Sequence, residues 1–343
     1  MQPTRVSVLG AGSWGTALAA LASAHADTLI WARDPEVARS IDARHINPRH
    51  LSDITLPQAL HATADFDQAM AHILTDTTAD RLIVLGVPVS GLADICSRIA
   101  QALPAQLPAP VHLLWTCKGI HPDTQQLPQE IIQNALPKSD GLHTGVLSGP
   151  SFANEVARGL PVALTLAGKH AGTGTVTQSA FHGTQARIYT TTDVIGVEIG
   201  GALKNVIAIA CGICDGLELG ANARAALITR GLAEMQRLGV ALGGLPDTFS
   251  GLAGVGDLVL TATGDLSRNR RVGVAISQGQ SLEHILAGGM TAEGVRCARA
   301  ALALGAQHHV DLPITAAVCS VLFDGTPPKR AVAALLSRDP RPE

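Results

Sequence analysis

The sequence has no large excess of charge of either sign. Its 25 Lys and Arg residues nearly balance 28 Asp and Glu residues, which leaves a formal net charge of −3 at pH 7. Binding to nucleic acid or to an anionic membrane surface usually needs a strongly basic surface. The sequence therefore predicts neither partner, and any basic residue that contributes to function must act locally.

Long uninterrupted apolar segments are missing as well. A membrane helix needs about 18 apolar residues in a row, and the sequence has no run of about that many apolar residues without charged or glycine breaks. The N-terminus has no charged segment followed by an apolar one and a cleavage site, because its first apolar run is a predicted strand. We therefore expect a cytoplasmic protein of about two domains without membrane insertion.

The small number of cysteines excludes a disulfide scaffold. Six cysteines are too few to staple a chain of 343 residues. The pair Cys211 and Cys214 has the Cys-x-x-Cys spacing of some redox and metal sites. It lies in a predicted buried helix, however, and no second Cys or His pair stands at ligand spacing. We interpret both thiols as helix packing and predict no metal site.

The most informative segment that is present is a glycine turn near the N-terminus. Val6 to Leu9 has the pattern of a buried strand, and an Ala-rich helix follows. Between them, Gly10, Gly12 and Gly15 have Gly-x-Gly-x-x-Gly spacing. The first Gly allows a tight turn, the second lets the backbone approach a pyrophosphate, and the third lets the helix lie close to the strand. Because the helix start also favours an anion, the segment predicts dinucleotide binding.

Strand and helix patterns divide the chain into two parts. Up to about residue 165, short apolar runs alternate with helical stretches, which is typical of a parallel sheet. The further strands that we expect are Thr28–Trp31, Arg81–Val87, Val111–Thr116, Gly145–Leu147, Leu160–Ala167 and Arg187–Thr190. Past residue 193, long helices rich in Ala, Leu and Gly replace the strands. The predicted fold class is α/β, with a Rossmann-type doubly wound domain over residues 1–191 and an all-α domain over residues 192–343.

The end of the second predicted strand bears on the choice of cofactor. In sites that prefer NAD, an acidic residue about 20 positions beyond the glycines binds the ribose 2′-hydroxyl. Here Arg33 and Asp34 follow the strand. The planar guanidinium of Arg33 suits a 2′-phosphate, whereas Asp34 can still serve NAD. The sequence favours NADP(H) and leaves NAD(H) open.

Lys204 is the strongest candidate for a proton donor in the helical domain. It stands alone among small and apolar residues of a predicted helix. Burial there would lower its pKa toward a range that suits proton exchange. The alternative is a lysine that extends along a half-buried helix to solvent. Asn205 beside it offers an amide that can orient a substrate oxygen.

Two further polar clusters lie in the same domain. Asp257 follows a Gly-rich turn and precedes a helix, where it can orient Lys204 or simply cap the helix. Arg268 and Arg270 flank Asn269, a local positive group in an acidic protein. Such a group suits a phosphate, although a solvated basic helix start has the same pattern.

These residues carry a family resemblance. From about residue 5 to residue 337, the chain resembles the bacterial NAD(P)-dependent glycerol-3-phosphate dehydrogenases. The motifs of the resemblance are Gly12-Ser-Trp-Gly-Thr-Ala-Leu-Ala19, Lys118-Gly119, Ser148-Gly-Pro-Ser-Phe-Ala153, Gly200-Gly-Ala-Leu-Lys204-Asn-Val-Ile-Ala208, Gly220–Met235, Gly254-Val-Gly-Asp257-Leu-Val-Leu-Thr261, Ser267-Arg-Asn-Arg-Arg271 and Glu293-Gly294. Several colinear motifs across both domains are far more specific than the glycine turn alone.

The resemblance implies a role for each matching residue. The implied cofactor contacts are Gly10, Gly12, Ser13, Trp14, Gly15, Arg33, Lys118, Ala153, Arg268, Thr291 and Glu293. The implied substrate contacts are Lys118, Gly149, Ser151, Lys204, Asp257, Ser267, Arg268 and Asn269. Lys204 matches the general acid and base, with Asp257, Lys118 and Asn205 beside it in the catalytic group. The resemblance also implies a homodimer that supplies the phospholipid backbone.

The expected reaction is reduction of dihydroxyacetone phosphate to sn-glycerol 3-phosphate by NADPH or NADH. The substrate would bind between the domains, and Lys204 would protonate the developing alkoxide while Lys118 and Asn205 stabilise its charge. One alternative is a related 3-hydroxyacid or ketopantoate-type reductase, which would prefer a carboxylate substrate. A second is a nucleotide-sensing module, which would bind the cofactor without turnover.

Overall fold

The computed structural model describes residues 3–183, 185–288 and 292–338 and divides into two units. The sheet unit comprises Met1–Cys117 and Pro128–Val194, and the helical unit comprises Lys118–Leu127 and Ile195–Glu343. The segment Lys118–Leu127 packs with the helices because Ile120 and Leu127 are buried in their apolar core. The domain limits expected from the sequence placed this segment in the first domain, whereas here Lys118 belongs to the helical unit.

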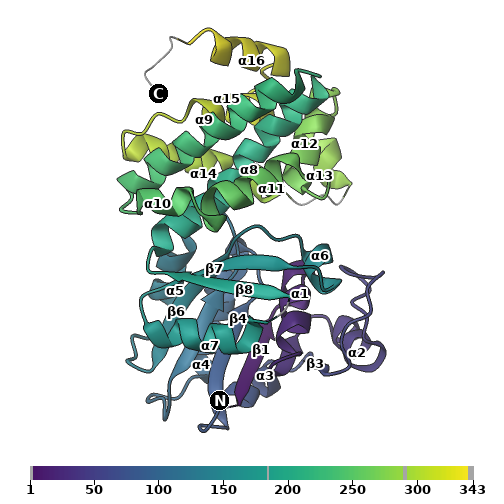
Figure 1. The fold of residues 1–343 in the computed structure, drawn as a ribbon, viewed down its shortest axis with the longest axis vertical. Coiled ribbons are helices and arrows are strands. Elements are labelled where there is room, and N and C mark those ends of the chain that lie inside the picture. Colours follow the sequence, from purple (N-terminus) through teal and green to yellow (C-terminus); the bar gives the residue numbers. More distant parts are fainter. Residues whose placement is uncertain (1–2, 184, 289–291, 339–343) are drawn as a thin grey trace. The chain divides into compact units, whose positions relative to one another are not determined.

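Eight strands form one sheet in the described part of the sheet unit (Figure 1). They are β1 (Thr4–Leu9), β2 (Asp27–Trp31), β3 (Leu60–Thr63), β4 (Asp80–Leu85), β5 (Val111–Trp115), β6 (Leu142–Ser148), β7 (Val162–Gly168) and β8 (Ala186–Thr191). Their order is β3-β2-β1-β4-β5-β6-β7-β8, and every neighbouring pair is parallel except β6 with β7. The α/β fold class is confirmed, and every strand predicted from the sequence is present.

Two features of the sheet were not predicted. The strand β3 has only four residues, which is too short for a clear alternating pattern. The strand β7 runs antiparallel to β6, although a parallel sheet was expected. The connection between them contains α6 (Ala153–Ala157), and this single helical turn does not carry the chain back across the sheet as a parallel crossover requires.

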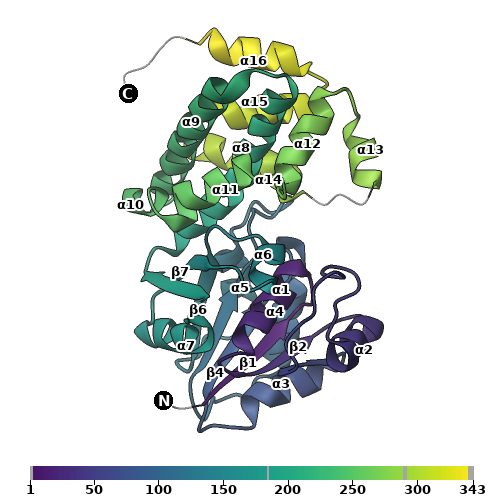
Figure 2. The same cartoon turned by 45° about the vertical axis from the view of Figure 1, so that its right-hand side comes forward.

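Helices cover both faces of this sheet, as Figure 2 shows. They are α1 (Ser13–Ala22), α2 (Pro35–Arg44), α3 (Phe66–Leu74), α4 (Leu92–Ala102), α5 (Pro128–Ala135) and α7 (Ala171–Phe181), with a 3₁₀ turn at Val89–Gly91. Successive side chains of β1 point to opposite faces of the sheet. Val6 and Val8 pack in the core with α1 and α7, whereas the Ser7 hydroxyl donates to the carbonyl of Ala69 on α3 at 2.8 Å.

The helical unit is built around one long buried helix. Its helices are α8 (Val194–Gly216), α9 (Gly220–Ala241), α10 (Pro246–Phe249), α11 (Asp257–Thr263), α12 (Arg268–Ser277), α13 (Leu282–Ala287), α14 (Glu293–Gln307), α15 (Pro313–Phe323) and α16 (Pro328–Leu336), with a π-helical turn at Leu252–Gly256. Among the residues that the structure describes, only α8 is long and apolar enough to span a membrane, yet 94% of its most apolar window is buried inside the protein. We interpret α8 as the core helix of this unit.

Glycines let α8 and α12 approach until their backbones touch. A Cβ atom on Gly212 would lie 2.0 Å from the carbonyl oxygen of Arg270, and one on Gly273 would lie 2.1 Å from that of Ile209. Any side chain at these positions would push the helices apart. This close contact brings the start of α12 next to the polar residues of α8.

The Cys-x-x-Cys pair lies inside α8. Cys211 and Cys214 are buried, and burial raises the pKa of the Cys211 thiol to about 12. Among residues 3–183, 185–288 and 292–338, no group of three or more His, Cys, Asp or Glu side chains is arranged to hold a metal ion. Both thiols therefore remain protonated packing groups at neutral pH.

Candidate active site

The glycine turn joins β1 to α1 in the sheet unit. Gly10 has a φ of 122°, which side chains rarely adopt, and a Cβ on Gly15 would lie 2.1 Å from the carbonyl oxygen of Gly10. A Cβ on Gly12 would meet nothing closer than 3.9 Å, so space is open at that position. The start of α1 has no acidic residue and no side-chain cap, which leaves its N–H groups for an anion. Ser13 and Trp14 are its first two residues, and the turn fits a dinucleotide pyrophosphate.

Gly86 completes this turn, although sequence reasoning did not identify it. It follows β4, and its N–H donates to the carbonyl of Leu9 at 2.9 Å. A Cβ on Gly86 would lie 2.8 Å from the carbonyl oxygen of Gly10. The strands β1 and β4 are neighbours where the strand order reverses, and ligands of such sheets bind in the crevice at that point. In the sequence, the available signal was a glycine near the end of the expected strand Arg81–Val87.

The end of β2 carries the two residues that bear on the cofactor. Arg33 is exposed in the loop between β2 and α2. Asp34 caps α2, where its Oδ1 accepts the N–H of Glu36 at 2.9 Å. Its Oδ2 forms an ion pair with Arg49. The acidic residue expected to serve NAD is therefore already paired.

The motif after β6 also lies in the sheet unit. Gly149 has a φ of 120°, and the Ser151 hydroxyl donates to its carbonyl at 3.1 Å. Ala153 is the first residue of α6. The cofactor and substrate contacts implied for these three residues stay predictions.

The candidate catalytic residues meet in the helical unit. Lys204 Nζ, on α8, donates to Asp257 Oδ1 at 2.5 Å and to the Thr261 hydroxyl at 2.9 Å, both on α11. Lys118 Nζ donates to the other carboxylate oxygen, Oδ2, at 2.6 Å. Asp257 is fully buried, and its carboxylate binds the lysines instead of capping α11. One carboxylate thus holds two ammonium groups.

Burial sets the acidity of Lys204. Desolvation lowers the pKa of Lys204 to about 8, the Asp257 carboxylate opposes this shift, and the positive charge of Lys118 adds to it. An ammonium with a pKa near neutrality can both give up and regain a proton. The cluster therefore has the properties of an acid–base group.

A chain of amides connects α8, α12 and α14 beside this cluster. Asn269 Nδ2 donates to Asn205 Oδ1 at 2.8 Å, and Asn269 Oδ1 accepts the N–H of Gly294 at 3.0 Å. Asn205 Nδ2 donates to the carbonyl of Gly201 at 3.1 Å. These bonds fix the orientation of both amides and leave each Nδ2 a second N–H.

The two arginines at the start of α12, Arg268 and Arg270, have different surroundings. Ser267 caps the helix by accepting the N–H of Arg270 at 3.2 Å. The Arg270 guanidinium is bound by Asp215 at 2.7 Å and by Asp265 at 2.9 Å. Arg268 is exposed. The sequence grouped both arginines as a phosphate site, but in the structure Arg270 is bound by two carboxylates.

Of the two cofactor contacts that the resemblance implies near α14, the structure describes only Glu293. Thr291 lies outside the described residues. Glu293 is the first residue of α14, and burial raises the pKa of its carboxyl group, opposed by the charges of Arg296 and Arg268.

Thr261 is a site residue to which the sequence assigned no role. It lies one helical turn after Asp257 and donates to the carbonyl of that residue at 2.7 Å. Its position four residues after a predicted functional carboxylate on the same helix was the available signal.

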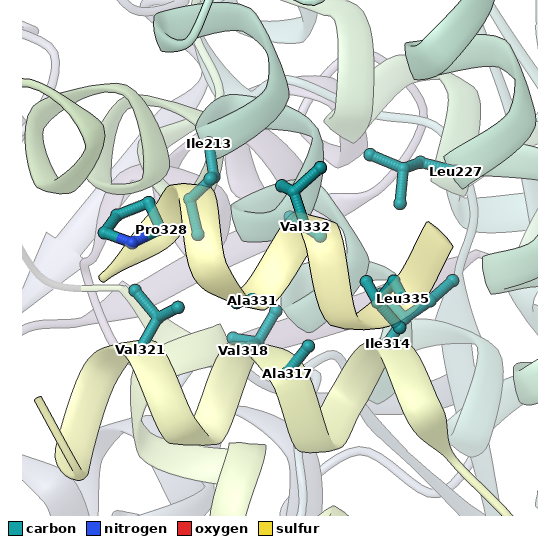
Figure 3. Close-up of a pocket in the computed structure, with 11 residues that line it drawn as sticks. Ile213, Leu227, Ile314, Ala317, Val318, Val321, Pro328, Ala331, Val332 and Leu335 are labelled. Atoms are coloured by element: carbon teal, nitrogen blue, oxygen red, sulfur yellow. The ribbon is translucent and has the colours of Figure 1, made fainter. Parts of the chain in front are cut away.

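The apolar cavity in the helical unit is a different feature (Figure 3). It has a volume of about 30 Å³, close to that of one water molecule. Its walls are Ala210, Ile213, Leu227, Ile314, Ala317, Val318, Val321, Pro328, Ala331, Val332 and Leu335. Because none of these side chains is polar, we interpret the cavity as a packing gap beneath α16.

Comparisons with known proteins show which family the chain resembles over its whole length. Models of the N-terminus and C-terminus of NAD-dependent glycerol-3-phosphate dehydrogenase match residues 5–173 and 193–333. The chain is 55% identical over 340 residues to the glycerol-3-phosphate dehydrogenase (NAD(P)+) of Burkholderia orbicola, covering 99% of this chain and 100% of that one. The crystal structure of the glycerol-3-phosphate dehydrogenase of Coxiella burnetii has a TM-score of 0.88 at 36% identity, covering 98% and 99% of the two chains.

The alternative reductase class shares only the fold. A probable 2-dehydropantoate 2-reductase from Bacillus subtilis has a TM-score of 0.52 at 13% identity, covering 93% of this chain and 99% of that one. Its likeness does not favour a carboxylate substrate.

Proposed function

Because this chain belongs to the family of NAD-dependent glycerol-3-phosphate dehydrogenases, it catalyses NAD(P)H-dependent reduction of dihydroxyacetone phosphate to sn-glycerol 3-phosphate, and we propose that Lys204 is its general acid and base. The observation that carries this assignment is the buried contact of Lys204 with Asp257 and Thr261. A reduced nicotinamide supplies the hydride when it is bound. The reverse reaction requires Lys204 to accept the proton that it donates during reduction.

Lys118 stabilises the oxygen that receives the proton. Its ammonium shares the Asp257 carboxylate with Lys204, so two positive charges face one negative charge. Alkoxide charge that develops on the substrate oxygen is attracted by this excess. Asp257 acts as a positioning residue that keeps both ammonium groups in place.

The amides orient the substrate. Asn205 and Asn269 each keep one N–H after their bonds within the protein, and we assign these two donors to substrate oxygens. The start of α12 has no acidic residue in its first turn, and Arg268 adds a positive charge there. We assign Ser267, Arg268 and the first N–H groups of α12 to the substrate phosphate.

The proposed cofactor contacts come from residues of both units. The glycine turn, with Ser13 and Trp14, would hold the pyrophosphate, and Arg33 would lie at the adenosine end. Ala153, Arg268, Glu293 and Thr291 complete the set that the family resemblance implies, together with Lys118. Gly149 and Ser151 remain proposed substrate contacts.

The product and the cellular setting follow from the reaction. sn-Glycerol 3-phosphate is the backbone precursor of glycerophospholipids, which places the enzyme in lipid metabolism. We further propose a cytoplasmic homodimer. Light scattering during size-exclusion chromatography tests the dimer, and fractionation of the source cells tests the location.

The absorbance of the reduced nicotinamide tests the reaction directly. We expect it to decline when dihydroxyacetone phosphate is added with NADPH or NADH. Parallel assays with 2-keto acids that lack a phosphate, ketopantoate among them, should show no comparable turnover. Turnover of the keto acids alone would contradict the proposed substrate, and cofactor binding without any turnover would indicate a sensing module.

A further inference from the structure

Arg49 contacts Asp34, the acidic residue that bears on the choice between NADPH and NADH. Arg49 lies in the loop after α2, and its guanidinium pairs with Asp34 Oδ2. The other oxygen of Asp34 accepts the N–H of Glu36. An NAD-preferring site offers such a carboxylate to the ribose 2′-hydroxyl. Here each oxygen of the Asp34 carboxylate already has a partner within the protein.

The loop of Arg49 is tied to the glycine turn by a buried amide. Asn47 is fully buried, and its Nδ2 donates to the carbonyl of Ala11 at 2.9 Å and to the Thr16 hydroxyl at 2.8 Å. Its Oδ1 accepts the N–H of Arg49 at 3.2 Å. Both donors and the acceptor of one amide thus connect the pyrophosphate turn to the backbone of Arg49, which fixes that residue at the adenosine end of the crevice.

The charges at this end favour a phosphate. Asp34 alone would repel the 2′-phosphate of NADPH, and the Arg49 guanidinium neutralises it. A guanidinium has five N–H donors, so Arg49 can hold Asp34 and still donate to phosphate oxygens. Its side chain is 63% exposed, which leaves it accessible to a ligand. Arg33, directly before Asp34, is exposed as well.

We propose that Arg49 determines the preference for NADPH by neutralising Asp34 and, together with Arg33, binding the 2′-phosphate. The proposal rests on the proposed function for the class of cofactor. When Arg49 is removed, Asp34 Oδ2 becomes an acceptor for the 2′-hydroxyl of NADH. Arg49 therefore acts on the two cofactors in opposite directions.

Binding of nucleotide fragments tests the contact without turnover. Calorimetric titration would compare adenosine 2′,5′-bisphosphate with adenosine 5′-monophosphate, which differ only in the 2′-phosphate. Arg49→Ala should weaken the bisphosphate roughly tenfold, the loss expected for one charged hydrogen bond, and should not weaken the monophosphate. Unchanged affinity for the bisphosphate would overturn the proposal.

Kinetics with both cofactors test the role of Asp34. In Arg49→Ala, kcat/KM should fall with NADPH and rise with NADH. Adding Asp34→Ser should cancel the gain with NADH, because Ser still caps α2 but does not offer the second carboxylate oxygen. Equal losses with both cofactors would mean that Arg49 only supports the loop, and would overturn the proposal.

Arg44→Ala is the matched control. Arg44 is an exposed arginine at the end of α2 whose guanidinium donates to the Ser40 hydroxyl at 3.0 Å. Its removal should change neither fragment affinity nor cofactor preference, and an equal effect at Arg44 would reduce the result at Arg49 to general electrostatics. If the fragment pattern holds but no dihydroxyacetone phosphate is turned over, the specificity proposal stands and the proposed reaction fails.

Discussion

The Nζ atom of Lys204 lies 2.5 Å from Oδ1 of Asp257, although 53 residues separate them along the chain. The second oxygen of this carboxylate accepts Lys118 at 2.6 Å. The buried group consequently carries a net positive charge when both lysines are protonated. The proton donation and the stabilisation of alkoxide charge that we propose for these lysines would both depend on this excess.

Replacing Lys204 with Met should abolish proton donation and leave the cofactor bound. General acid catalysis contributes about 10²–10⁴-fold, so kcat should fall by at least that factor. Asp257 keeps Lys118 as a partner, so the buried carboxylate does not become unpaired. Steady-state kinetics and fluorescence titration of the cofactor measure the two effects. Loss of cofactor affinity in a folded variant would mean that Lys204 is structural.

The pH dependence should reflect the lowered pKa of Lys204. Reduction needs the protonated ammonium, so its rate should be highest below pH 8 and should decline as the pH rises through about 8. Oxidation of sn-glycerol 3-phosphate needs the neutral amine, so its rate should rise over the same range. Initial rates in both directions provide the check. A reduction rate that increases through this range would contradict the assignment.

Asp257→Asn should shift that profile. The carboxylate raises the pKa of Lys204, and Lys118 lowers it. Without the carboxylate the repulsion between the lysines remains, so the midpoint for reduction should move to lower pH and the rate near neutrality should fall. Thr261→Val is the control, because it removes an uncharged partner of Lys204. An equal shift in both variants would exclude a charge effect.

Arg268→Ala should mainly weaken substrate binding. If Arg268 holds the substrate phosphate, KM for dihydroxyacetone phosphate should rise roughly tenfold or more, as expected for a lost charged hydrogen bond. Arg271→Ala on the same helix is the matched control, because Arg271 is also exposed but has no proposed ligand. An unaltered KM in Arg268→Ala would refute the anchor role.

Local patterns in the sequence predicted the elements that depend on neighbouring residues. The glycine turn was predictable because Gly10 and Gly15 contact each other across a single strand–helix turn. The strands that line the core were predictable from their apolar runs. The short strand β3 and the reversed direction of β7 were not, because their pairing depends on neighbouring strands.

The sequence by itself determined the α/β fold class, the position of the glycine turn and the solitary Lys204, because each follows from residue types within a few positions. Only the tertiary structure decided that Asp257 serves two lysines, that Arg270 binds carboxylates, and that Asp34 is paired with Arg49. Lys118 and Asp257 are 139 residues apart, and no periodic pattern encodes a contact of that range. Such contacts arise when packed helices and loops bring distant side chains together. They decide which charged side chains are paired with one another.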